Sequence, residues 1–102
     1  MQNTMGRYKL SKQAEFDLAE IWRYTLENWS REQADKYISG LLNAFSEIGT
    51  SPETTGQSYE HVLEGYRKCP FGKHIIFYKV LMDDDVLISR VLHERMDFDR
   101  HL

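Results

Sequence analysis

The chain has 102 residues, of which 41% are hydrophobic and 13% aromatic, and its formal net charge is −3. This length suits one domain with one core, and the apolar content is enough to build that core, which excludes a disordered chain. The negative charge argues against an independent nucleic-acid-binding protein, because phosphate contacts supply most of the affinity in non-specific binding. Residues 65–80 differ, with four Lys or Arg residues and no acidic residue. Any surface that meets an anion should therefore come from the second half of the chain.

No run of apolar residues approaches the ~20 that cross a bilayer, and the first ten residues have no apolar signal-peptide core. We therefore expect a cytoplasmic protein that has no contact with a membrane. The single cysteine, Cys69, cannot form an internal disulfide, and no Cys/His spacing is typical of a zinc site. We expect no metal and no cofactor, and we interpret Cys69 as a small strand residue rather than a reactive thiol.

The first half of the chain predicts a short strand and two helices. Residues 7–10 alternate polar and apolar side chains and lead to Ser11, a helix cap, which predicts the strand. From residue 12 to residue 29, apolar side chains recur every three or four positions and form one stripe along a helix. Ser30 begins a capping box for a second helix, which we expect to end at Gly49. Because the joint is so short, the two helices should form an antiparallel hairpin.

The second half predicts strands. Residues 49–64 have no sustained period and are predicted to form a loop. Three runs rich in β-branched and aromatic residues follow, at 66–69, 74–81 and 86–93. Their connections are short, which predicts a three-stranded antiparallel meander. The aspartates at 83–85 lack the spaced ligands of a calcium loop, so they indicate a solvated turn.

These elements predict one domain over residues 1–102, with an α+β fold in two layers. A strand, a helical hairpin and a three-stranded antiparallel meander follow one another, and both helices cover one face of the sheet. Along the last strand, strict alternation places Arg90 on the same face as Val86 and Ile88. Both faces then carry apolar side chains. We therefore expect the face away from the helices to be open and to meet something other than water.

Two segments resemble a known family. The order strand, helix, helix, three strands, together with GYRKCPFGKHIIFYKV at residues 65–80 and LISRVLHERMD at 87–97, resembles the RelE/ParE superfamily of toxins from bacterial toxin–antitoxin modules. The ending LHERMD, preceded by HIIFYKV, is most similar to the ParE branch. The resemblance covers nearly the whole chain.

The resemblance implies the toxin of a type II module, of the kind associated with plasmid stabilisation, and no catalytic residue of its own. Such a toxin binds DNA gyrase and promotes cleaved DNA, and a cognate ParD-type antitoxin neutralises it. The antitoxin wraps a flexible C-terminal segment around the toxin, while its separate N-terminal domain binds operator DNA. This chain would therefore meet the operator only indirectly, through its antitoxin.

The predicted contacts with gyrase or its DNA lie on the basic strand and near the end of the last strand. They are Arg67, Lys73, His74, Arg90, His93, Arg95 and Met96. The predicted contacts with the antitoxin are the aromatic residues Trp22, Trp29, Tyr37 and Phe77. Simpler roles stay open: the two arginines suit ion pairs between neighbouring strands, and the two tryptophans suit the core.

Two other functions also stay open. RelE-like toxins cut messenger RNA on the ribosome, which requires a base, an acid and cations that stabilise the phosphate. The candidates for that chemistry are Arg67, Lys73, His74, Tyr78, Arg90, His93, Glu94 and Arg95. It is disfavoured because the adjacent His93 and Glu94 point to opposite sides of a continuous strand and because the chain has no terminal tyrosine. The third possibility is an inactive homologue that acts only as a binding partner.

Overall fold

The computed structural model describes residues 7–102, apart from the side chain of Asp99. The elements are β1 (Tyr8–Leu10), α1 (Lys12–Asn28), α2 (Arg31–Thr50), α3 (Pro52–Thr55), β2 (Gln57–Ser58), β3 (Arg67–Phe71), β4 (His74–Val80), β5 (Val86–His93) and the 3-10 helix η1 (Phe98–Arg100). The strands form one sheet in the order β1-β5-β4-β3-β2. β1 runs parallel to β5, and the other neighbours are antiparallel.

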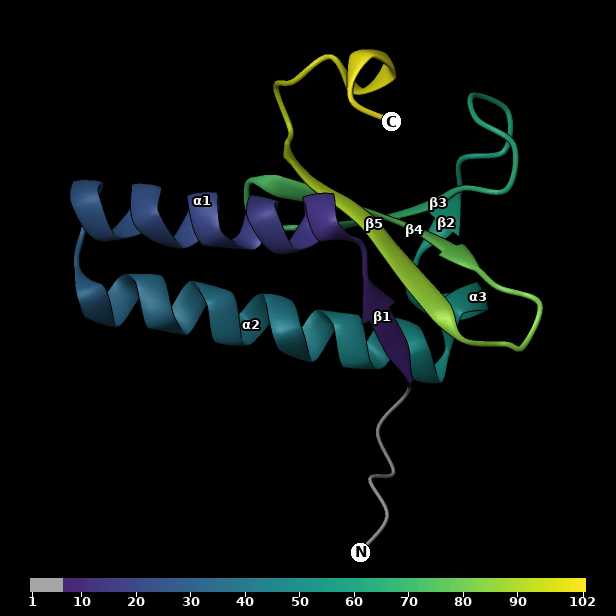
Figure 1. The fold of residues 1–102 in the computed structure, drawn as a ribbon, viewed down its shortest axis with the longest axis horizontal. Coiled ribbons are helices and arrows are strands. Elements are labelled where there is room, and N and C mark those ends of the chain that lie inside the picture. Colours follow the sequence, from purple (N-terminus) through teal and green to yellow (C-terminus); the bar gives the residue numbers. More distant parts are fainter. Residues whose placement is uncertain (1–6) are drawn as a thin grey trace, which may run out of the picture.

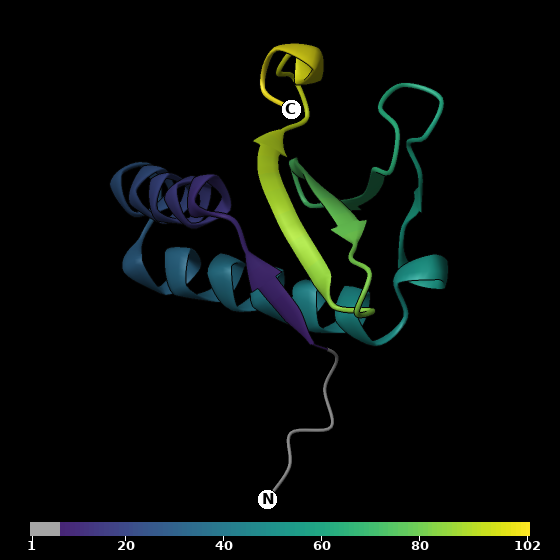
Figure 2. The same ribbon diagram turned by 45° about the vertical axis from the view of Figure 1, so that its right-hand side comes forward.

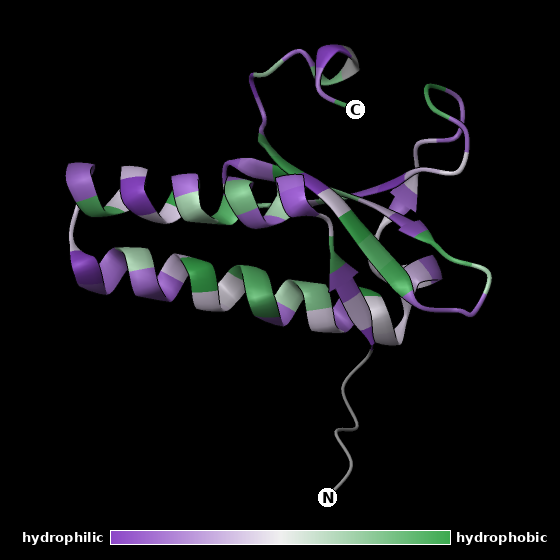
Figure 3. Cartoon of the chain, in the orientation of Figure 1, coloured by the Kyte–Doolittle hydropathy of each residue, from purple (hydrophilic) through white to green (hydrophobic). Residues whose placement is uncertain are grey.

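The predicted α+β fold is confirmed, with α1 and α2 side by side as an antiparallel hairpin against the sheet (Figure 1). Serine caps begin both helices: Oγ of Ser11 accepts from the amide of Ala14 at 2.9 Å, and Oγ of Ser30 from that of Gln33 at 3.1 Å. Hydrophobic residues recur at intervals along both helices and fill much of β5 (Figure 3). None of the helices in the described part of the chain has the length and apolar content needed to span a membrane.

The predicted loop at residues 49–64 is wrong in part, because it holds α3 and β2. The helix α2 continues past the predicted end at Gly49 and ends at Thr50. The next residue, Ser51, is not helical, as expected of a residue that precedes a proline. Pro52 then occupies the first turn of α3, where its missing N–H costs nothing. A strand of two residues and a helix of four are too short to give a periodic signal.

The strand β3 extends two residues beyond its predicted end at Cys69. Pro70 lies within it, which is tolerated because β2 pairs only with Arg67 and Lys68, so the far side of Pro70 is an open edge. The connection to β4 is therefore a two-residue turn that begins at Gly72, whose φ of 55° favours glycine.

A β-bulge interrupts β5. Consecutive residues of β4 pair with Arg90 and Ile88, so Ser89 between them is an extra residue. Alternation reverses there, and Val91 joins Val86 and Ile88 in the core beneath the helices. The prediction that Arg90 shares a face with Val86 and Ile88 is therefore wrong.

Two apolar clusters pack on opposite faces of the sheet. The larger lies under the helices and includes Leu41, Phe45, Ile48, Ile76 and Tyr78, all fully buried. The smaller, on the other face, consists of Tyr59, Phe77 and Leu92, with Leu63, Tyr66, Ile75, Phe98 and Leu102 packed against it. The loop after β2 and the C-terminal segment stand over this end of the sheet (Figure 2). The face expected to be open is thus covered by the chain itself at one end.

Candidate functional site

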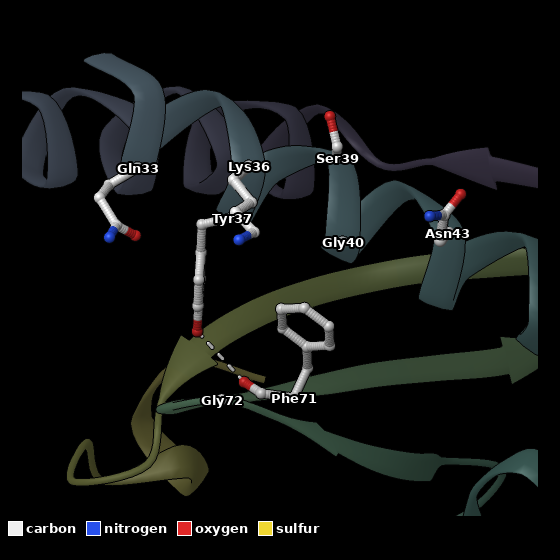
Figure 4. A pocket seen from close by; sticks show the side chains of 8 residues that line it. All are labelled: Gln33, Lys36, Tyr37, Ser39, Gly40, Asn43, Phe71 and Gly72. Carbon is white, nitrogen blue, oxygen red and sulfur yellow. Dashed lines mark hydrogen bonds between the residues drawn. The ribbon is translucent and has the colours of Figure 1, made fainter. Parts of the chain in front are cut away.

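A groove of about 580 Å³ lies between α2 and the turn from β3 to β4 (Figure 4). We call it the α2 groove, and its lining residues are Gln33, Lys36, Tyr37, Ser39, Gly40, Asn43, Phe71 and Gly72. The ring of Phe71 rises from β3 toward Gly40 (Figure 4), where a Cβ atom would lie 2.6 Å from its Cζ. Any other residue at this position would have to push the ring aside. The groove combines this aromatic wall with amide, hydroxyl and ammonium groups along α2.

Tyr37 fastens α2 to the β3–β4 turn. Its hydroxyl lies 3.2 Å from the carbonyl of Phe71, 2.8 Å from Nδ1 of His74 and 3.1 Å from the amide of Lys73, which donates to it. Burial raises the pKa of Tyr37. A Cβ atom at Gly72 would lie 2.5 Å from this hydroxyl, so the turn admits only glycine there. One end of the α2 groove is consequently tied to the sheet by hydrogen bonds.

Two of the predicted site residues, His74 and His93, meet at the end of the sheet. They are paired across β4 and β5, and their ring centroids lie 5.4 Å apart. The strand stops at His93, and the amide of Glu94 donates to the carbonyl of Lys73 at 2.8 Å. That bond brings the turn after β3 against the segment after β5, so Lys73, His74 and His93 lie together with the start of the C-terminal segment.

We expect the stability of the protein to fall below about pH 6.5, partly because of His74. Burial, and next the neighbouring His93, lower the pKa of His74, and the carboxylates of Asp17 and Glu94 oppose the shift. The unfolded chain therefore binds this proton more tightly than the folded protein. The contribution is complete above the unfolded pKa and is lost as the pH falls toward the folded one.

Urea unfolding at pH 7.5 and at pH 5.5 measures this dependence. The variant His74→Gln should show a smaller loss of stability between the two pH values than the wild type. An equal loss in both proteins would contradict the assignment to His74.

Arg90 lies in an internal ion pair with Asp17 of α1. Its Nε and Nη2 donate to the two carboxylate oxygens of Asp17 at 2.8 and 2.9 Å, and its Nη1 donates to the carbonyl of His101 at 2.8 Å. The amide of Val91 also donates to Asp17. The hydrogen bonds to Asp17, together with its negative charge, raise the pKa of Arg90, although burial opposes the shift. Arg90 therefore joins a helix, a strand and the C-terminal segment, and its partner belongs to a helix rather than to a neighbouring strand.

Arg67 also turns inward. Its guanidinium donates to the backbone carbonyls of Pro52, Glu53 and Gly56 at 2.9 to 3.1 Å. The hydroxyl of Tyr78 donates to the carbonyl of Pro52 at 2.7 Å, and burial raises the pKa of this fully buried tyrosine. Both side chains fasten α3 to the sheet. The structure thus turns Arg67 and Tyr78, which share the carbonyl of Pro52 and bond to each other at 3.3 Å, toward α3, and it turns Arg90 toward Asp17. The three side chains do not converge on one open site.

The remaining predicted residues are scattered. Lys73 and Arg95 are exposed, and Met96 is 39% exposed. Trp29 is 74% exposed at the joint of the helices, whereas Trp22 is half-buried with its Nε1 donating to Asp35 at 2.9 Å. Phe77 is fully buried in the smaller apolar cluster. Of the four aromatic residues predicted to meet the antitoxin, Tyr37 alone lines the α2 groove.

Sequence reasoning missed Gly40 and Phe71. A signal was present, because a glycine inside a helix costs about 1 kcal/mol relative to alanine and so usually has a packing reason. Gln33, Lys36, Gly40 and Asn43 also recur at three- and four-residue spacing, which places them on one face of α2. In the part of the chain that the structure describes, no group of three His, Cys, Asp or Glu side chains is placed to hold a metal ion.

Comparison with known proteins identifies similar sequences along almost the entire chain. Residues 8–98 match the family described as ParE toxin of type II toxin-antitoxin system, parDE. Toxin ParE1 of Mycobacterium tuberculosis (strain ATCC 25618 / H37Rv) is 38% identical over 97 residues, which are 95% of this chain and 98% of the relative. Toxin ParE1 of Caulobacter vibrioides is 38% identical over 98 residues, 96% and 99% of the two chains. Toxin ParE of Escherichia coli is 29% identical over 93 residues, 91% and 89%.

Two solved structures share the fold. One, described as the chromosomal ParDE TA system from P. aeruginosa, has a TM-score of 0.74 at 16% identity and covers 89% of this chain and 98% of that chain. The other, a toxin–antitoxin complex named RelBE2 from Mycobacterium tuberculosis, has a TM-score of 0.67 at 17% identity, with 88% and 99% covered. At these identities the similarity concerns the fold alone.

Proposed function

The chain belongs to the ParE toxin family of type II toxin–antitoxin systems, and from this premise we propose that it inhibits DNA gyrase by binding it and is neutralised by a ParD-type antitoxin. The proposal is supported by the extent of the family match, which runs from residue 8 to residue 98. It places the protein in the cytoplasm, where gyrase and DNA are found, and it requires neither a cofactor nor a catalytic residue.

One observation supports action by binding rather than by catalysis. The side chains of Arg67, Tyr78 and Arg90 are hydrogen-bonded to other groups of their own chain. Cleavage of RNA needs an acid, a base and cations that converge on one phosphate. Tyr78 is fully buried, and both arginines bond to groups of their own chain. Three of the eight candidate groups for that chemistry therefore hold the fold together, which favours a toxin that acts by binding its target.

We assign the antitoxin to the α2 groove. A flexible segment that folds on its partner needs a fixed surface with an apolar anchor point, because it must offset its own ordering cost. The ring of Phe71, which packs against Gly40, supplies that point, and Tyr37 holds the adjoining turn. The exposed Trp29 lies at the far end of α1, where it would extend the same contact.

We assign the target contact to the end of the sheet that carries His74 and His93. The bond between Glu94 and Lys73 holds the β3–β4 turn beside the segment after β5. Lys73, Arg95 and Met96 are the exposed members of the predicted set at this end. Arg90 would support the C-terminal segment beside this surface from within, whereas Arg67 holds α3 against the sheet, and neither would touch gyrase.

Purified protein incubated with gyrase, ATP and supercoiled plasmid should leave linear DNA after the proteins are removed. The cognate antitoxin, added first, should abolish the linear product. A reaction without gyrase and one with the double variant Lys73→Ala/Arg95→Ala serve as controls, and the variant should yield less linear DNA at equal antitoxin affinity.

Two results would contradict the proposal. Cleavage of messenger RNA on ribosomes with gyrase untouched would make the protein a nuclease. No effect on gyrase or on ribosomes, combined with tight antitoxin binding, would make it an inactive binding partner.

A further inference from the structure

Lysine side chains form a line across the sheet face that turns away from the helices. Lys9 of β1 is opposite Leu87 of β5, and Leu87 is opposite Lys79 of β4. The chain neighbours of these residues, such as Tyr8 and Tyr78, pack in the core beneath the helices, so both lysines point the other way. Strands lie about 4.8 Å apart, which sets the backbones of Lys9 and Lys79 roughly 10 Å apart.

A third lysine, Lys68, continues this line along β3. Lys68 pairs with Phe77 on the same face, two residues before Lys79 in β4. Tyr66 lies two residues before Lys68, and the ammonium group of Lys79 lies 5.1 Å from the centroid of its ring. Lys9, Lys68 and Lys79, which we call the lysine row, therefore follow one connected path from the uncovered end of this face to the edge of the smaller apolar cluster.

Two ammonium groups of the lysine row are held in place without a carboxylate. Nζ of Lys79 lies over the ring of Tyr66, and Nζ of Lys68 lies 5.0 Å from the ring centroid of Tyr59. The hydroxyl of Tyr66 is hydrogen-bonded to Ser89 at 3.1 Å, which fixes that ring. Within residues 7–102, neither lysine forms an ion pair. Both side chains are half-buried, and both positive charges are held in position without a carboxylate of the described chain to neutralise them.

We propose that the lysine row binds the phosphate backbone of duplex DNA. Lysine binds phosphate as a point charge, and a line of such charges suits a regular polyanion. An acidic peptide that adds a strand at the free edge of β1 fits less well, because it would lie beside Lys9 alone, whereas Lys79 and Lys68 are on strands that have a neighbour on both sides. The inference rests on the proposed function in one respect: the DNA in question is the segment that gyrase holds.

The charge around the lysine row explains why such binding would be weak on its own. The carboxylate of Asp85 lies 3.8 Å from Nζ of Lys9 and 2.8 Å from the guanidinium of Arg7. The whole chain also carries a net charge of −3. A contact of a few phosphates therefore becomes useful when the DNA is already held next to the protein by a larger partner.

The experiment measures binding of the full chain to a fluorescent duplex of 20 base pairs by anisotropy, across a series of low salt concentrations. The affinity of the wild type should fall with rising salt, with a logarithmic slope of about −2 to −3, which corresponds to two or three phosphates. The variant Lys68→Gln/Lys79→Gln should bind at least ~10-fold more weakly and should lose about two units of that slope. Asp85→Asn should bind more tightly than the wild type.

Two further variants separate lost charge from lost structure. Lys68→Arg/Lys79→Arg keeps both charges and should keep most of the affinity. Lys12→Gln/Arg31→Gln removes two charges from the helical hairpin and should leave the affinity unchanged. Circular dichroism and urea unfolding establish that each variant is folded.

Three results would overturn the proposal that the lysine row binds DNA. They are no binding of the duplex at low salt, an equal loss of affinity in Lys68→Gln/Lys79→Gln and in Lys12→Gln/Arg31→Gln, and tighter binding of an acidic peptide of equal charge. None of these results depends on gyrase. If the wild type binds duplex DNA through the lysine row but has no effect on gyrase, DNA binding by the lysine row is supported and the proposed function fails. If gyrase is poisoned equally by wild type and Lys68→Gln/Lys79→Gln, the proposed function stands and the row does not serve it.

Discussion

Replacing Asp17 by alanine should lower the free energy of unfolding by about 3 to 5 kcal/mol, because it leaves a buried guanidinium without its counter-charge. The side chains of Arg90 and Asp17 are 15% and 9% exposed, and two parallel hydrogen bonds join them. The carboxylate also accepts from the amide of Val91, which would lose its partner as well. Urea unfolding monitored by tryptophan fluorescence measures the difference.

A matched control is the exposed pair of Glu20 and Arg23 on the same helix. Alanine at Glu20 should cost less than about 1 kcal/mol, as is typical of surface pairs. A loss that small for Asp17→Ala would mean that water replaces the carboxylate, and it would contradict a structural role. The double variant Asp17→Leu/Arg90→Met should be more stable than Asp17→Ala, because it removes both charges together.

Replacing Arg67 by alanine should lower the free energy of unfolding by about 2 to 3 kcal/mol, since charge-assisted hydrogen bonds to three carbonyls disappear. Lysine at this position should restore only part of the loss, because an ammonium group cannot reproduce the planar fork of donors. Limited proteolysis should show earlier cleavage within residues 50–58 in both variants. The exposed Arg31 provides the control, with an expected change below about 0.5 kcal/mol.

This second prediction also separates structure from function for Arg67. If Arg67→Ala unfolds as the wild type does and yet no longer arrests growth, then Arg67 touches the target directly. If growth arrest is lost together with stability and returns at a lower temperature, the role of Arg67 is to hold α3 in place.

Much of the fold could be predicted because the hairpin and the meander have strong local signals. Serine caps at Ser11 and Ser30, and apolar residues every three or four positions, define α1 and α2 without reference to the rest of the chain. The bulge at Ser89 could not be predicted in this way, because an extra residue in one strand has meaning only against its partner strand. The self-covered face likewise depends on Phe98 and Leu102 reaching back to β4 and β5.

The site residues were harder to predict, because their partners lie far along the chain. A sequence pattern identifies Arg90 as a cation on a strand, but Asp17 lies 73 residues away on a helix. Arg67 bonds to backbone carbonyls, which are present at every residue and carry no sequence signal. Tyr37 was predicted as a contact residue, but its hydrogen bond to Phe71 was not. The reason is that the β3–β4 turn begins two residues later than expected, so that Phe71 belongs to the strand.

The parallel pairing of β1 with β5 has a consequence for the folding of the chain during its synthesis on the ribosome. The first strand has its one neighbour in β5, which begins at Val86, so the sheet can close only after the residues of β5 have been made. Contacts of such long sequence separation form late and slowly. A nascent chain that already contains both helices therefore still lacks a complete sheet, and translation itself delays the moment at which a fully folded molecule exists.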